Sequence, residues 1–168
     1  QEAADVIQDL LTLARRGRCT MAPTNLNLVV RNFLDSPAFS NLTYHRPEVE
    51  VVVDLDESMG RMQGSPPHLS KVIMNLIFNA FDAIHGPGKV SIITGSQYLE
   101  ELSNGLKLGE SSGNYLLLRI VDTGEGIAPE YIEKIFEPYF SRKKLGRSSG
   151  SGLGLSVVYG VIKDHRGY

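Results

Sequence analysis

Apolar residues recur at three- and four-residue steps through residues 69–84, the spacing of one face of an α-helix. At about 100° per residue, that face holds Leu69, Val72, Ile73, Leu76, Ala80 and Ala83. Asn75, Asn79 and Asp82 fall together at its edge. The pattern predicts a core helix with a stripe of short, oxygen-bearing side chains. Such a stripe suggests a ligand, although hydrogen bonds to neighbouring loops explain it equally well.

Alternating and β-branched segments elsewhere predict strands at residues 48–55, 61–64, 89–94 and 115–121. Further helices are predicted over residues 26–34, with Thr24 or Asn25 as the cap, and from Pro129 to Ile135. Residues 37–47 are predicted to be a loop because a proline stands at each end. Together these elements predict an α+β fold, a two-layer α/β sandwich with helices on one face of a mixed sheet.

A narrow apolar stripe through residues 2–16 is typical of a coiled coil and ends at Gly17. A stripe of that width needs a partner, either the rest of this chain or a second helix. A linker through Pro23 follows it.

Two glycine-containing segments add candidate chemistry. Asp122 begins a turn at the end of a predicted strand, where its carboxylate can accept a hydrogen bond from an exocyclic amine. Residues 150–154 lead directly into an apolar helix, where exposed backbone N–H groups and the helix dipole favour phosphate. The plain alternatives are a β-turn and a flexible loop.

Composition narrows the function classes. The 168 residues are 42% hydrophobic and 21% charged, which is enough for one globular domain with an appendage. The net charge of −2 gives no reason to expect nucleic-acid binding. Arg142, Lys143, Lys144 and Arg147 form a basic cluster in the Ser- and Gly-rich segment 141–150, which we expect to act as a lid.

Cys19 is the only cysteine, so the sequence cannot form an internal disulfide and the cytosolic side is expected. The sequence contains neither a signal peptide nor an apolar run of roughly 20 residues. We expect the chain to be a fragment, with any membrane anchor of the full-length protein outside it.

Four segments in a characteristic order resemble the ATP-binding catalytic domain of sensor histidine kinases, in the superfamily that also contains gyrase B, the Hsp90 chaperones and MutL. They are residues 75–80 (N box), 122–127 (G1 box), 135–140 (F box) and 150–155 (G2 box). The resemblance covers roughly residues 60–168. Residues 139–143 and 156–162 are most similar to the nitrogen-regulator-like and PAS-linked hybrid kinases.

The resemblance implies ATP and Mg²⁺ as cofactors, with Asn79 as the metal ligand and Asn75 on the phosphate side. Asp122 would accept from the adenine N6 amine, and Lys143 would meet the phosphates. Asn75, Asn79 and Lys143 are the implied catalytic residues. The remaining implied nucleotide-binding residues are Asp82, Gly124, Gly126, Ile127, Gly150, Gly152, Leu153, Gly154 and Leu155.

The sequence departs from the family pattern at two positions. Asp82 stands where many members carry a basic residue, and it would hold a water or a lid residue or face solvent. The chain ends at Tyr168, before the further strands of the family, so the sheet is expected to lack an edge.

Asn75 replaces the glutamate that activates water in hydrolytic relatives such as gyrase B, so slow ATP hydrolysis is expected.

The resemblance also implies partners. Residues 1–19 would end the dimerisation and phosphoacceptor helix, and residues 20–168 would form the catalytic domain, truncated at its C-terminal end. The acceptor histidine would lie outside the chain, because all four histidines lack its sequence context and are predicted to be surface residues: His45, His68, His85 and His165. A response-regulator receiver domain and homodimerisation of the full-length protein complete the expected partners.

Three other functions remain to be compared with this one. The tripeptide 122–124 is also the active-site sequence of aspartic proteases, but a single copy would need a dimer. A dinucleotide-binding Rossmann fold at residues 150–154 is disfavoured, because no βαβ unit follows these residues. A non-catalytic ATP-sensing or protein-docking module of the same fold is the serious alternative.

Overall fold

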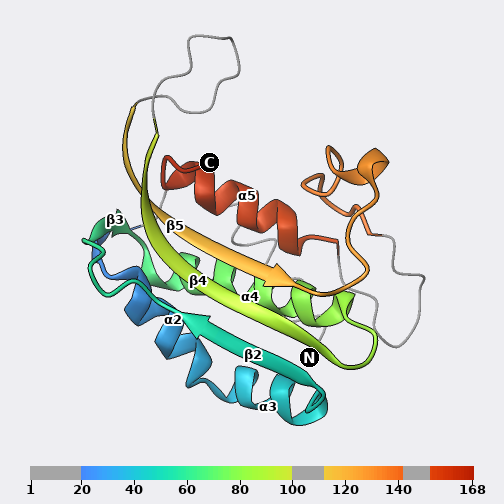
Figure 1. Cartoon of the computed structure of the whole chain (residues 1–168). Coiled ribbons are helices and arrows are strands. Elements are labelled where there is room, and N and C mark those ends of the chain that lie inside the picture. The colour runs from blue at the N-terminus through green and yellow to red at the C-terminus, as the bar shows by residue number, and fades with distance from the viewer. Residues whose placement is uncertain (1–19, 100–111, 142–151) are drawn as a thin grey trace.

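The computed structural model describes residues 20–99, 112–141 and 152–168, arranged as two layers (Figure 1). The elements in chain order are β1 (Ala22–Thr24), α2 (Leu26–Leu34), α3 (Pro37–His45), β2 (Val49–Asp54), β3 (Met62–Gly64), α4 (Pro66–Ala83), β4 (Gly88–Leu99), β5 (Gly113–Asp122), a 3₁₀ turn (Pro129–Tyr131) and α5 (Gly154–Asp164). None of the helices in this described part combines the length and the apolar character needed to cross a membrane.

The main sheet has the strand order β2-β4-β5 and is mixed, as predicted. β2 runs parallel to β4, with Val49 opposite Gly88, and β4 runs antiparallel to β5, with Val90 opposite Asp122. β1 and β3 form a separate antiparallel pair. Helices α2, α4 and α5 lie on one face of the main sheet (Figure 1), which confirms the predicted two-layer α/β sandwich.

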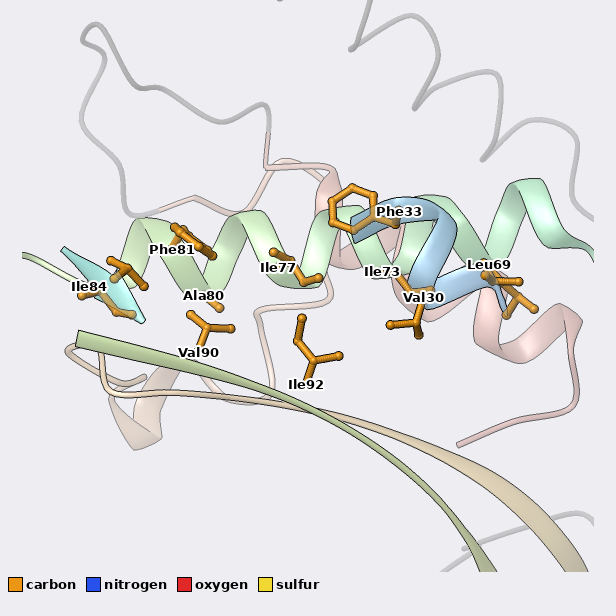
Figure 2. Packing of buried hydrophobic residues seen from close by; sticks show 12 residues of the cluster. Val30, Phe33, Leu69, Ile73, Ile77, Ala80, Phe81, Ile84, Val90 and Ile92 are labelled. Carbon is orange, nitrogen blue, oxygen red and sulfur yellow. The ribbon is translucent and has the colours of Figure 1, made fainter. Parts of the chain in front are cut away.

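Helix α4 forms the centre of the core and packs on two sides. Prolines at its first turn suit a helix start, where the N–H that proline lacks would have no intrahelical partner. Figure 2 shows Ile77 and Ala80 facing Val90 and Ile92 of β4. On its other side Val72 packs against α5, in a cluster with Val157, Val158 and Val161. The single apolar face predicted from the sequence was therefore too narrow, because Ile77 and Phe81, outside it, are fully buried.

Residues 37–45 form helix α3, so the predicted loop was wrong. Pro37 occupies the first turn of the helix, where its fixed φ is favourable. Ser36 caps the start, its Oγ accepting from the N–H of Phe39 at 3.3 Å. The prolines that suggested a loop therefore lie at the first residue of a helix and just beyond its end.

Two predicted strands are longer in the structure than expected. β4 continues to Leu99 and β5 begins at Gly113, so the hairpin extends well past the predicted strand ends. The segment expected to be an insertion is therefore partly strand, and its remainder, residues 100–111, lies outside the described residues. The expected end of the dimerisation helix, residues 1–19, and most of the expected lid, residues 142–150, also lie outside them.

Candidate functional site

The N-box side chains of α4 have different environments. Asn75 is buried, and its Nδ2 donates to the backbone O of Gly154 at the start of α5, at 3.1 Å. Asn79, one turn later, is exposed, and its side chain forms no hydrogen bond with another described residue. Asp82 is also exposed. Asn75 therefore holds two helices together, whereas the amide oxygen of Asn79 is open to a ligand.

The turn after β5 packs against the C-terminal end of α4. The N–H of Glu125 donates to the backbone O of Ala83 at 3.0 Å. A Cβ on Gly124 would lie 2.6 Å from that same oxygen, a distance that real Cβ atoms essentially never show. Only glycine fits here, because any side chain would push the turn away from the helix.

Asp122 ends β5 and shapes the same turn. Its Oδ1 accepts from the N–H of Gly124 at 2.8 Å, while Oδ2 has no partner among residues 20–99, 112–141 and 152–168. Beyond it, Gly126 has a φ of +71° and Ile127 is 52% exposed. One carboxylate oxygen therefore holds the turn, and the other remains available to a ligand.

The glycine segment before α5 packs on the F box. Gly152 has a φ of +68°, and a Cβ there would lie 2.7 Å from the carbonyl carbon of Tyr139. Tyr139 itself has a φ of +65°. Leu153 is fully buried, and its carbonyl accepts from the N–H of Val157 at 2.9 Å. This close backbone contact packs the start of α5 against Tyr139 of the F box.

The structure therefore places the G1 turn and the start of the G2 segment against α4, and the F box against the G2 segment. Gly124 contacts Ala83, Asn75 bonds Gly154, and Gly152 packs on Tyr139. In Figure 1 the segment that follows β5 and the start of α5 lie on the same side of the molecule. Leu155 is partly buried in the first turn of α5. Lys143 and Gly150, also predicted for this site, lie outside the described residues.

A cavity of about 970 Å³ lies elsewhere, between β5 and the ends of α4 and α5 that are remote from these segments. Its walls are largely apolar and include Leu69, Leu116 and Ile162. Asn75, Asn79, Asp122 and the described glycines of the predicted site do not line it. The candidate site thus depends on the packing of the segments around α4 rather than on this cavity.

Two histidines predicted to lie on the surface are partly buried and bonded. The ring of His165 joins the end of α5 to the start of α4, because Nε2 accepts from the N–H of Ser65 at 2.9 Å. Its Nδ1 lies 2.7 Å from the O of Val161, which places the proton on Nδ1. His68 contacts the Oγ of Ser65. His45 and His85 are exposed as predicted. The sequence carries no signal for the bond between His165 and Ser65, because these residues lie 100 positions apart along the chain.

Comparison with known proteins identifies the family of this arrangement. Residues 64–168, more than half of the chain, match the family described as histidine kinase-, DNA gyrase B- and HSP90-like ATPases. The chain belongs to this family. Its ATP-binding fold excludes the aspartic-protease and Rossmann interpretations of the glycine segments.

Within the family, the sequence relatives are sensor kinases. The chain is 30% identical to the sensor histidine kinase ZraS of Salmonella typhimurium over 162 residues, covering 96% of this chain and 30% of that protein. It is 33% identical to the sensory histidine kinase/phosphatase NtrB of Rhodobacter capsulatus over 120 residues, covering 70% of this chain and 32% of that protein. The chain thus spans about a third of the length of these relatives, and it corresponds to their ATP-binding catalytic domain.

Solved structures show the same fold. The nucleotide-free catalytic domain of histidine kinase ThkA superposes with a TM-score of 0.65 at 23% identity, covering 86% of this chain and 80% of that one. Full-length ShkA in complex with AMPPNP superposes with a TM-score of 0.67 at 19% identity, covering 95% of this chain and 30% of that one. These likenesses confirm the predicted fold class.

Proposed function

We propose that this domain transfers the γ-phosphoryl group of ATP to a histidine on a dimerisation domain, as part of a two-component sensor histidine kinase. The packing of the N box, the G1 turn and the start of the G2 box around the exposed Asn79 carries this proposal. The kinase ZraS aligns along 96% of the chain, which disfavours a non-catalytic module of the same fold.

Asn79 is the residue we propose as the Mg²⁺ ligand. Its side chain is exposed and forms no competing hydrogen bond within the described part of the chain. An amide carbonyl is a hard, neutral oxygen, which suits an ion that keeps several waters and takes further ligands from phosphates. Bound Mg²⁺ would supply charge neutralisation at the phosphates. Asp82, exposed on the next turn, would contribute through a bound water.

Asp122 is the residue we propose for adenine recognition. Its Oδ2 is available, and the close approach of Gly124 to Ala83 fixes the carboxylate beside the end of α4. Gly126 and Ile127 would flank the base, since the first leaves space and the second offers exposed apolar surface. An amine donor at the purine six position is thus favoured over a carbonyl.

For the phosphates we propose the start of α5, where the N–H groups of a helix N-terminus favour negative charge. Gly152, Leu153, Gly154 and Leu155 are the described residues of this segment. Lys143 and Gly150 are assigned to it from the sequence alone.

Asn75 would have a structural role at this site rather than a role as a base. Its amide takes up no proton near neutral pH and already donates to Gly154. The residue therefore cannot activate water as a base, which would protect the γ-phosphate for transfer.

The partners we propose follow from the same assignment. Residues 1–19 would end the dimerisation and phosphoacceptor helix, and residues 20–168 would be the catalytic domain. The full-length protein would be a homodimer that passes the phosphoryl group to a response-regulator receiver domain. The domain would work on the cytosolic side, where ATP is available, and nucleic acid is not an expected partner at a net charge of −2.

Radiolabelled ATP tests the proposal. The chain alone should bind ATP yet incorporate no label, because the acceptor histidine would be elsewhere. Adding the separate dimerisation segment of the full-length protein should allow slow labelling of that segment, since a bimolecular encounter replaces proximity within one chain. Acid-labile label on the chain alone would contradict this division of roles. ATP binding without label on the added segment would favour a non-catalytic module.

A further inference from the structure

The C-terminal end of α4 is held by a residue from another part of the fold. The last turn of a helix leaves carbonyl groups without intrahelical partners, and a cation near them is favourable. α4 carries no basic residue in its own last turn. Arg46, which follows α3, occupies that position instead: its Nη1 donates to the O of Phe81 at 3.0 Å and its Nη2 to the O of Ile84 at 2.7 Å.

Glu48 orients this arginine. The Nε of Arg46 donates to Oε1 of Glu48 at 2.6 Å, and the side chain of Arg46 is only 26% exposed. The hydrogen bond from Arg46 holds the pKa of the Glu48 carboxyl below its usual range, so the carboxylate stays charged beside the guanidinium near neutral pH. The planar guanidinium presents its donors to a carboxylate and two carbonyls in a fixed fork, whereas the three donors of an ammonium group all radiate from one nitrogen.

Between the two carbonyls that Arg46 binds lies the one that holds the G1 turn. The O of Ala83 accepts from the N–H of Glu125 at 3.0 Å, and Gly124 packs on the same residue. Movement of the last turn of α4 would therefore carry this turn with it. Asp122, whose Oδ1 is bonded to the N–H of Gly124, would move as well.

We infer that Arg46 is a positioning residue for the nucleotide site, fixing the last turn of α4 and through it the carboxylate of Asp122. This inference rests on the proposed function of Asp122 but makes a separate claim about Arg46. Arg46 stays outside the site itself, so its effect should reach ATP only through the G1 turn.

The test compares ATP affinity, measured calorimetrically with Mg²⁺, among three variants. Arg46→Ala should weaken binding about tenfold, the equivalent of one charge-assisted hydrogen bond. Arg46→Lys keeps the charge but reaches fewer acceptors, so its affinity should be intermediate. The matched control is Arg31→Ala, because Arg31 lies on α2 and forms an exposed ion pair with Glu57. It should change affinity by no more than about twofold.

A double-mutant cycle separates positioning from a general loss of structure. If Arg46 acts through Asp122, the effect of Arg46→Ala should shrink to about twofold or less in an Asp122→Ala background, since coupled residues are not additive. Fully additive losses, or an unchanged affinity in folded Arg46→Ala, would overturn the inference. If Arg46→Ala does not fold, Arg46→Lys takes its place in the cycle.

Amide exchange at Glu125 gives a readout that does not need ATP. Its N–H should exchange faster in the Arg46 variants than in the wild type, and at the wild-type rate in Arg31→Ala. Equal exchange rates in all of these proteins would overturn the inference. A wild-type chain that binds no ATP would instead refute the proposed function. The exchange rate at Glu125 would then still decide whether Arg46 holds the turn.

Discussion

At the scale of single residues, Asp122 shows how one side chain can combine a structural and a binding role. Its Oδ1 accepts from Gly124 and maintains the turn, while Oδ2 is available for a ligand. Asparagine can reproduce the first role, because it also has one side-chain oxygen. It cannot reproduce the second, because its NH₂ group would face a donor on the base.

Asp122→Asn should therefore weaken ATP binding by about 1–3 kcal/mol while leaving the unfolding free energy nearly unchanged. Asp122→Ala should reduce both. Titration calorimetry and urea denaturation measure the two quantities. GTP, with a carbonyl at the purine six position, should bind the wild type poorly, and equal affinities for ATP and GTP would remove Asp122 from adenine recognition.

Asn79 differs from Asn75 in exposure, and this difference separates their expected roles. Asn79→Ala should abolish the gain in ATP affinity that Mg²⁺ gives the wild type, because it deletes the proposed protein ligand. Titrations with Mg²⁺ and with a chelator provide the measurement. Asn32→Ala on the exposed face of α2 is the control and should keep the gain. A retained Mg²⁺ gain in Asn79→Ala would contradict the assignment.

At the scale of elements, the contact between Gly152 and Tyr139 joins the start of α5 to the F box. The backbone of Gly152 is left-handed, with a φ of +68°, and it has no room for a Cβ. Ring packing supports the same junction, because Phe136 and Tyr159 have centroids 5.6 Å apart. The position of the proposed phosphate-binding segment therefore depends on a glycine at this site.

Gly152→Ala should lower the unfolding free energy by at least about 1–2 kcal/mol, the cost of a left-handed residue with a Cβ. ATP affinity should fall with it, as α5 is displaced from the F box. Gly95→Ala in β4 is the matched control, since a Cβ there meets nothing within 4 Å. Thermal denaturation and ATP titration measure both effects. Equal stability of the two variants would show that the contact is dispensable.

At the scale of the whole molecule, the larger part of the core lies between α4 and the sheet, a smaller part lies between α4 and α5, and the candidate site lies beside the exposed Asn79. Ile77 is fully buried against β4, and Asn79 lies two residues further along the helix. Folding and nucleotide binding should therefore be linked, because the same helix supports both. A ligand that binds only the folded state stabilises it by mass action.

Ile77→Ala should lower the unfolding free energy by about 2–5 kcal/mol through loss of buried contacts and the cavity left behind. Leu28→Ala, at a position 55% exposed on α2, is the control and should change it by less than about 0.5 kcal/mol. ATP with Mg²⁺ at about 100 times the dissociation constant should restore about 2.7 kcal/mol. Urea denaturation with and without nucleotide measures this, and a failure of nucleotide to stabilise either variant would contradict the linkage.

Several elements can be predicted from local signals along the chain. Helix periodicity placed α4 within a few residues, alternation placed β2 and the shared part of the hairpin, and the order of the four motifs identified the family later matched by comparison. These inferences succeeded because side-chain periodicity and turn chemistry depend on neighbours along the chain.

Features that depend on distant partners become visible only in the folded chain. Ile77 is buried by residues from other elements. Arg46 caps α4, and His165 bonds Ser65, although the partners are well separated in sequence. Glycine at position 124 suggested a turn, but its need for contact with Ala83 became apparent only once β5 and α4 were packed. Local patterns specify which element forms, whereas close approach and hydrogen-bond partners are set by how the elements pack.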